Sequence, residues 1–195
     1  MKERHLAHLI RNRILTYGDR EAIRFKGKDE YKSMSWNELK LKIDLVAKFL
    51  INEGQGTKSN IGIYSQNYPE WTISDFAILS VRGVVVPIYA TSTYNQLEYV
   101  IKETEMEVLF VGDELQLTNA MDALERCDSL KKIVTFSCSE MDDERIICIE
   151  KIFNTVFSSE IEDKLEQQLN EAASEDLATI IYTSGTTGEP KGVML

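Results

Sequence analysis

Residues 182–192, which read YTSGTTGEPKG, hold the densest group of side chains that could do chemistry. Four Ser and Thr hydroxyls follow one another there, interrupted only by Gly185. Glycines accept backbone angles that other residues avoid, so successive amides can turn toward an anion. The hydroxyls add neutral donors, and Lys191 adds a compact positive charge. The segment therefore has the groups that a polyphosphate-binding loop needs.

Two other interpretations of this segment have to be weighed. A surface turn between strands can have the same composition, but the flanking apolar runs 177–181 and 193–195 would anchor the loop to a sheet and favour a functional role. A Walker P-loop requires Ser or Thr after its lysine and a helix beyond it. Here Gly192 follows Lys191, and the next residues are strand-like. The dinucleotide-binding pattern GxGxxG is missing from the sequence, so neither a GTPase nor a dehydrogenase is favoured.

Four short apolar runs precede the loop, and helix-like segments separate them. The runs are residues 61–64, 84–88, 108–111 and 133–136, and the helical segments are residues 69–82, 95–104 and 114–126. Buried strands that alternate with helices are typical of βαβ crossovers. The sequence therefore predicts an α/β fold with a mostly parallel sheet flanked by helices.

The N-terminal part predicts a helix, a β-hairpin and a second helix. The first helix covers residues 3–16, and the hairpin strands are residues 22–26 and 31–34. Ser35 and Glu38 have the spacing of a capping box, and Gly54 ends the helix that follows. We therefore expect two parts: residues 1–58, and an αβα subdomain at residues 59–195 that ends in the loop at 182–192.

Composition excludes several classes of protein. Of the 195 residues, 43% are hydrophobic and 28% are charged, which is ordinary for a globular protein, and the net charge is −10. An acidic surface repels nucleic acids and anionic membranes, so we expect no nucleic-acid partner. No apolar run approaches the roughly 20 residues of a membrane span, and the charged N-terminus does not resemble a signal peptide. A cytoplasmic location is the default expectation.

The three cysteines and two histidines predict no metal site. Cys127, Cys138 and Cys148 match neither a zinc spacing nor a CxxC redox pair, so we expect reduced, buried thiols. His5 and His8 share one helix face, but no cysteine or carboxylate follows at a matching spacing. We assign both histidines to surface or packing roles.

The string YTSGTTGEPKG resembles the phosphate-loop signature of the AMP-forming adenylating superfamily, which includes acyl-CoA synthetases, luciferases and peptide-synthetase adenylation domains. Residues 33–39 and 80–88 are similar to two further motifs of that family, with Val84 where many members have Ala. Residues 67–71 and 86–93 look most like long-chain fatty acid–CoA ligases. The resemblance implies the first αβα subdomain of an adenylate-forming N-terminal domain, with the remaining domain parts outside this sequence.

The resemblance also implies a two-step reaction. A fatty carboxylate attacks the α-phosphorus of Mg·ATP, and CoA then displaces AMP from the acyl-adenylate. Lys191 would be catalytic by neutralising the departing pyrophosphate, and the Thr183 hydroxyl would bind ATP and contribute to the Mg²⁺ shell. The remaining ATP-binding residues would be Ser184, Gly185, Thr186, Thr187 and Gly188.

Several alternatives stay open at this point. The parent enzyme could activate an amino acid or an aryl acid in place of a fatty acid, or the chain could be a non-catalytic nucleotide-binding or interaction module. We expect this segment alone to be inactive, because the adenine, ribose and acyl contacts of the family lie beyond Leu195. Homo-oligomerisation and peripheral membrane contact are also left open.

Overall fold

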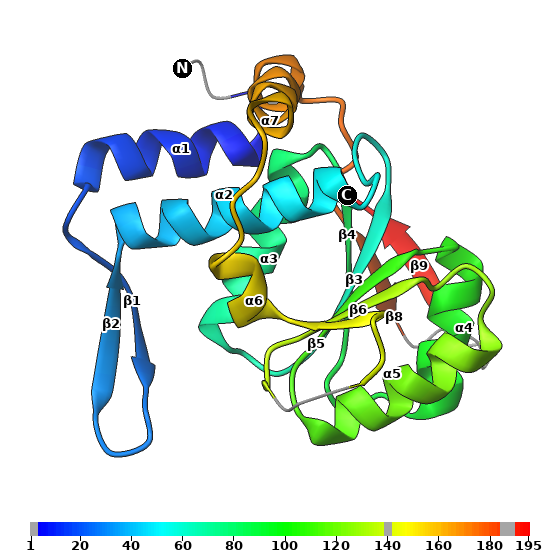
Figure 1. The fold of residues 1–195 in the computed structure, drawn as a ribbon. Helices are drawn as coiled ribbons and strands as arrows, with labels where there is room; N and C mark the ends of the chain where they lie inside the picture. The colour runs from blue at the N-terminus through cyan, green and yellow to red at the C-terminus, as the bar shows by residue number, and fades with distance from the viewer. Residues whose placement is uncertain (1–3, 139–141, 184–189) are drawn as a thin grey trace.

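A five-stranded parallel sheet forms the centre of the molecule (Figure 1). The computed structural model describes residues 4–138, 142–183 and 190–195. In spatial order the strands are β4 (Val84–Ile88), β3 (Asn60–Tyr64), β5 (Val108–Val111), β6 (Lys132–Thr135) and β7 (Ile146–Cys148). Each neighbouring pair is parallel, which confirms the predicted α/β fold with a parallel sheet.

Helices cover both faces of this sheet. On one face lie α2 (Trp36–Asn52), α3 (Pro69–Ser80) and α6 (Ile149–Phe153). Outside them, α1 (Leu6–Tyr17) and α7 (Ser159–Glu171) pack against α2 and α3 (Figure 1). The other face packs against α4 (Tyr94–Thr104) and α5 (Glu114–Arg126). Along β3, Ile61 and Ile63 face the first layer, whereas Tyr64 faces the second. Burial on both faces explains why the strands read as continuous apolar runs.

The N-terminal elements form where the local signals predicted them. Strands β1 (Glu21–Lys26) and β2 (Tyr31–Ser35) pair as an antiparallel hairpin that projects from the body of the molecule (Figure 1). The Ser35 hydroxyl accepts a hydrogen bond from the Glu38 amide at 3.2 Å, and the Glu38 carboxylate accepts one from the Ser35 amide at 2.7 Å. This capping box begins α2 as expected. The proposed division of the chain after residue 58 stays a prediction.

The strand that leads into the loop begins later than its apolar run. That run begins at residue 177, but β8 covers Ile180–Thr183. The side chain of Asp176 accepts hydrogen bonds from Arg82 Nε at 2.8 Å and Nη2 at 3.0 Å, and from the Ala173 amide at 3.1 Å. These bonds hold residues 173–176 in a turn, so the extended segment starts only after Asp176.

The expectation of three reduced, buried thiols is wrong for two of the cysteines. Cys127 is buried and free, but Cys138 is exposed and forms a disulfide with Cys148 across a Cα–Cα distance of 5.2 Å. The sequence prediction also missed the short strand β7, which ends at Cys148. Pairing of β7 with β6 places Cys148 opposite Thr135, three residues before Cys138. This register brings the two cysteines together.

Across the residues that the structure describes, we find no helix with both the length and the apolar character needed to cross a membrane.

A half-buried carboxyl on α3, that of Asp75, should make stability depend on pH. Burial raises the pKa of Asp75 from its ordinary value of 3.8 to about 6. Between these two pH values the folded state binds more protons than the unfolded state, so the free energy of unfolding should fall as the pH rises from about 4 to about 6. Asp75→Asn should abolish most of this fall and stabilise the protein at pH 7 by about 1–3 kcal/mol.

Denaturant unfolding at a series of pH values from 4 to 8 measures this effect. Plotted against pH, the free energies of unfolding of the wild type and of Asp75→Asn should diverge between about pH 4 and about pH 6. Above the pKa of Asp75 in the folded state, the two curves should run parallel. Parallel curves over the whole range would show that Asp75 is solvated in the folded state.

Candidate functional site

A β-hairpin at the C-terminal end of the chain carries the two described residues of the predicted phosphate site. Strand β8 pairs antiparallel with β9 (Lys191–Met194), and Thr183 is the Cα partner of Lys191. Both residues are exposed. Directly opposite residues in an antiparallel pair lie on one face of the ladder. The structure therefore brings the hydroxyl of Thr183 and the ammonium group of Lys191 to the same end of the hairpin.

The segment between the two strands carries the other predicted phosphate contacts. Ser184, Gly185, Thr186, Thr187 and Gly188 lie outside the described residues, so their predicted roles stay predictions. The two hairpin residues flanking this segment fit the expected ligand, since a hydroxyl and an ammonium group both donate hydrogen bonds to phosphate oxygens.

The hairpin is attached to the edge of the parallel sheet. Thr179 forms a parallel bridge with Val85 of β4, and its hydroxyl donates to the Val85 carbonyl at 2.8 Å. The Val85 amide donates to the carbonyl of Ala178 at 3.0 Å. Because β8 continues in the direction of β4, its end lies at the carboxyl edge of the strands. This edge is where open α/β sheets bind their ligands.

Tyr182 fixes the position of the strand immediately before the loop. The residue is 9% exposed, and its ring contacts that of Tyr99 of α4 edge to face, with ring centroids 6.3 Å apart. Burial of the Tyr182 phenol, together with the charge of Glu103 and a hydrogen bond to its side chain, raises the pKa of Tyr182. The phenol therefore stays protonated at neutral pH. Tyr182 thus ties the start of the loop to α4.

Tyr99 and Glu103 had not been predicted as part of the site. They lie four residues apart on α4, so they share one face of that helix. Their spacing was visible in the sequence, but nothing local indicated that this face would meet residue 182. That contact depends on how α4 packs beside the hairpin.

Gly192 provides the close approach that Tyr182 needs. A Cβ atom at position 192 would lie 2.9 Å from Ile180 Cγ2 and 3.3 Å from Tyr182 Cζ. We expect Gly192→Ala to displace these side chains and to lower the free energy of unfolding by about 1–3 kcal/mol. Denaturant unfolding measures this loss. Gly54→Ala is not a suitable control because its φ is +78°, whereas Gly56→Ala is, since a Cβ there would meet no atom closer than 3.7 Å.

If Gly192→Ala and Gly56→Ala lowered the free energy of unfolding equally, Ile180 and Tyr182 could move apart without loss of stability.

Two cavities flank the hairpin. A cavity of about 470 Å³ lies between β4, α4 and the hairpin, and its walls include Gln96, Tyr182, Thr183 and Pro190. A second cavity of about 450 Å³ lies at the ends of β3 and β4 and includes Ile181. Both volumes are in the range of small-molecule sites. The described end of the loop therefore borders space that a ligand can enter.

A family model described as "AMP-binding enzyme" matches residues 10–195. This match covers nearly the whole chain, including the hairpin and its loop. The chain belongs to the AMP-binding enzyme family. The resemblance seen in the YTSGTTGEPKG string is thereby confirmed at the level of the family.

Among similar proteins, the long-chain-fatty-acid–CoA ligase ACSBG2 of Xenopus laevis is 28% identical over 187 residues, which cover 96% of this chain and 25% of the relative. Long chain acyl-CoA synthetase 2 of Arabidopsis thaliana is 36% identical over 138 residues, covering 69% of this chain and 20% of the relative. The chain thus spans about a quarter of the length of the curated relatives that it matches.

Solved structures confirm the fold. The anthranilate CoA ligase AuaEII, determined in complex with anthranoyl-AMP, superposes with a TM-score of 0.79 at 20% identity, covering 97% of this chain and 34% of that one. The long-chain-fatty-acid-CoA ligase FadD1 from Archaeoglobus fulgidus superposes with a TM-score of 0.76 at 22% identity, covering 99% of this chain and 37% of that one. At these identities the likeness concerns the fold alone.

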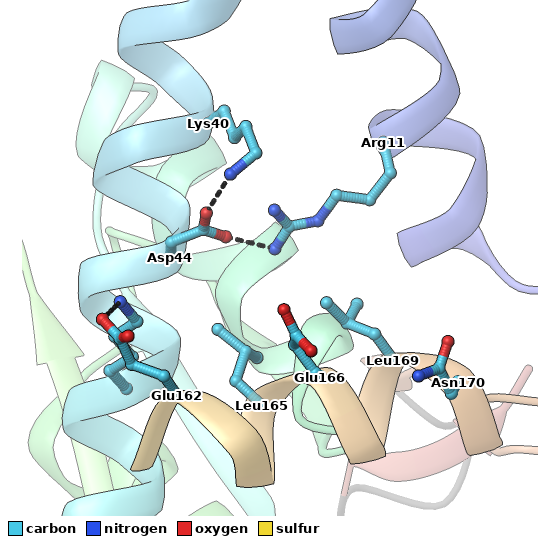
Figure 2. A pocket seen from close by; sticks show the side chains of 9 residues that line it. Arg11, Lys40, Asp44, Glu162, Leu165, Glu166, Leu169 and Asn170 are labelled. Atoms are coloured by element: carbon cyan, nitrogen blue, oxygen red, sulfur yellow. Dashed lines mark hydrogen bonds and ion pairs between the residues drawn. The ribbon is translucent and has the colours of Figure 1, made fainter. Parts of the chain in front are cut away.

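A third cavity, of about 540 Å³, lies between α1, α2 and α7 (Figure 2). Five of its six charged side chains form ion pairs with one another, and Glu166 is the sixth. Asp44 contacts both Arg11 and Lys40, and Lys48 Nζ lies 2.7 Å from Glu162 Oε1. Because the three cations and three anions around this cavity balance, and most of them contact each other, we assign this cluster to packing between the three helices.

The two histidines have structural roles at α1. His8 is buried, and its Nε2 lies 2.7 Å from the carbonyl oxygen of Leu169 on α7. The His5 ring accepts a hydrogen bond from the Ala7 amide at 3.2 Å and caps α1. Within residues 4–138, 142–183 and 190–195, no three His, Cys, Asp or Glu side chains are grouped as a metal site would require.

Proposed function

We propose that this chain is the N-terminal part of an ATP-dependent, AMP-forming long-chain fatty acid–CoA ligase. In the first half-reaction a fatty carboxylate oxygen forms a bond to the α-phosphorus of ATP, and the bond to pyrophosphate breaks. In the second, the sulfur of CoA bonds to the acyl carbon and AMP leaves. ATP and CoA are cytoplasmic substrates, so the proposal includes a cytoplasmic enzyme.

One observation carries the proposal. In a chain whose family match runs from residue 10 to 195, Thr183 and Lys191 face each other where the hairpin reaches the carboxyl edge of the sheet. Donors fixed at this point would stabilise the charge that develops on the departing pyrophosphate. The relatives named as long-chain ligases support a fatty acid as the carboxylate.

Each proposed role follows from the chemistry of a side chain. The exposed ammonium group of Lys191 would neutralise pyrophosphate oxygens, and the Thr183 hydroxyl would donate to a phosphate or face the magnesium shell. Bound Mg²⁺ would screen the charges of the triphosphate. Tyr182 would hold β8 in position without touching substrate, because its ring is turned into the core beside α4.

A second candidate is an aryl-acid-activating enzyme. The structural neighbour AuaEII is an anthranilate CoA ligase, and its TM-score of 0.79 is close to the 0.76 of the fatty-acid ligase FadD1. The fold therefore does not discriminate between the two acids. Pyrophosphate exchange by the full-length protein, measured with each class of acid, discriminates between the two candidates. We expect exchange that depends on long-chain fatty acids, whereas exchange with benzoates or amino acids alone would favour the second candidate.

The chain alone should bind Mg·ATP weakly. Thr183 and Lys191 supply only part of the contacts that a triphosphate needs, and the net charge of the chain is −10. We expect a dissociation constant of about 1 mM or weaker, equivalent to about −4 kcal/mol or less favourable. Calorimetric titration of residues 1–195 measures it. A low-micromolar constant would contradict the prediction and show that these residues already form a complete nucleotide site.

A further inference from the structure

The disulfide between Cys138 and Cys148 joins two cysteines in different environments. Cys148 is 8% exposed at the end of β7, whereas Cys138 is exposed in the loop that follows β6. Of the two residues, Cys138 is therefore the more accessible to an approaching thiol. Exposed disulfides are the ones most readily opened by exchange.

The backbone keeps the two cysteines together independently of the bond. Thr135 of β6 is the ladder partner of Cys148, and its hydroxyl donates to the carbonyl of Ser137 at 2.8 Å. This turn directs Cys138 back toward the end of β7. The opened cysteines would therefore remain neighbours, and the bond could form again.

The far side of the same loop has its own attachment. The guanidinium group of Arg145 donates to both carboxylate oxygens of Asp143 and contacts Glu125 at the end of α5. Arg145 precedes β7 directly, and its carbonyl accepts from the Ile133 amide at 2.9 Å. Opening the disulfide would thus leave β7 paired with β6.

We propose that Cys138 is a site of reversible modification by small thiols such as glutathione, with Cys148 as the resolving cysteine. A glutathione thiolate attacks the sulfur of Cys138, a new sulfur–sulfur bond forms there, and Cys148 leaves as a thiolate. Attack by Cys148 on the mixed disulfide restores the original bond and releases the glutathione thiolate. A second glutathione can instead attack the mixed disulfide, giving oxidised glutathione and the reduced cysteine pair.

The third cysteine provides an internal comparison. Cys127 is 3% exposed, and burial raises the pKa of its thiol. Fewer molecules carry the reactive thiolate at this position, and reagents cannot reach it in the folded protein. Modification should therefore select Cys138 over Cys127.

Thiol counting tests whether the pair exists. Protein is incubated with oxidised glutathione, free thiols are alkylated in denaturant, and peptides are identified by mass spectrometry. We expect alkylation of Cys127 alone, and of all three cysteines when reductant is added first. Alkylation of all three without reductant would overturn the proposal.

Single substitutions test the roles within the pair. Reduced protein is treated with oxidised glutathione in native buffer, and the mass of the intact protein is measured. Cys148→Ser should accumulate one glutathione on Cys138, because the resolving thiol is gone. Cys138→Ser should gain none, and Cys127→Ser should behave like the wild type. Equal labelling of Cys148→Ser and Cys138→Ser, or an adduct on Cys127, would overturn the assignment.

A stability measurement separates this chemistry from a folding defect. A disulfide closing a loop of this size should raise the melting temperature by about 5–10 °C relative to the reduced protein. Cys138→Ser and Cys148→Ser should have the melting temperature of the reduced wild type. That result would show that both variants fold. A wild-type melting temperature that reductant does not change would also count against the bond.

Discussion

Lys191→Ala in the full-length protein should lower the rate of fatty-acid-dependent AMP release by about 100- to 1000-fold, the range found when a fixed donor to a developing negative charge is removed. The effect should fall mainly on kcat, because the charge on pyrophosphate grows in the transition state. Lys191 is exposed on β9 at the open end of the hairpin, so its loss should leave the fold unchanged. Steady-state kinetics measures the rate of AMP release, and circular dichroism of the same preparation checks that the fold is unchanged.

A matched control for this experiment is Lys102→Ala. Lys102 is also an exposed lysine, on α4, where its Nζ lies 2.8 Å from Glu98 Oε1. Its removal changes the net charge by the same amount but should leave AMP release unchanged. If Lys191→Ala released AMP at the wild-type rate, the proposed catalytic role would be wrong. If both variants lost the same fraction of the rate, the cause would be a general effect of charge.

Asp44→Ala should be among the most destabilising single substitutions outside the sheet. Asp44 contacts the guanidinium group of Arg11, and the two side chains are only 15% and 10% exposed. Figure 2 shows both side chains extending into the space between α1 and α2. Removal of the carboxylate leaves a buried cation without a partner, which typically costs about 3–5 kcal/mol. We expect the lower end of this range, since the adjoining cavity admits water.

Denaturant unfolding of Asp44→Ala measures the loss, and a double variant tests its cause. Arg11→Met combined with Asp44→Ala removes the unpaired charge and should recover most of the stability. Glu160→Ala, which removes an exposed pair with Lys164, should not shift the midpoint. A loss below about 1 kcal/mol for Asp44→Ala would place the pair with ordinary surface ion pairs.

Two of the contacts described above join elements that are far apart in the chain. Arg11 meets Asp44 because α1 lies beside α2, and Tyr182 meets Glu103 because α4 lies beside the hairpin. The type of each residue was visible in the sequence, but its partner was not. Neither contact has a local periodicity that could indicate it.

The sequence alone was enough for the alternation of strands and helices, the capping box at Ser35 and Glu38, and the composition of the predicted phosphate loop. These features depend on residues within a few positions of each other, where hydrophobic periodicity and backbone capping act. The tertiary structure alone decided that Cys138 bonds Cys148, that Asp44 neutralises Arg11, and that Thr183 and Lys191 lie opposite at the carboxyl edge of the sheet. Each of these follows from strand register or helix packing, which depend on how distant segments share one core.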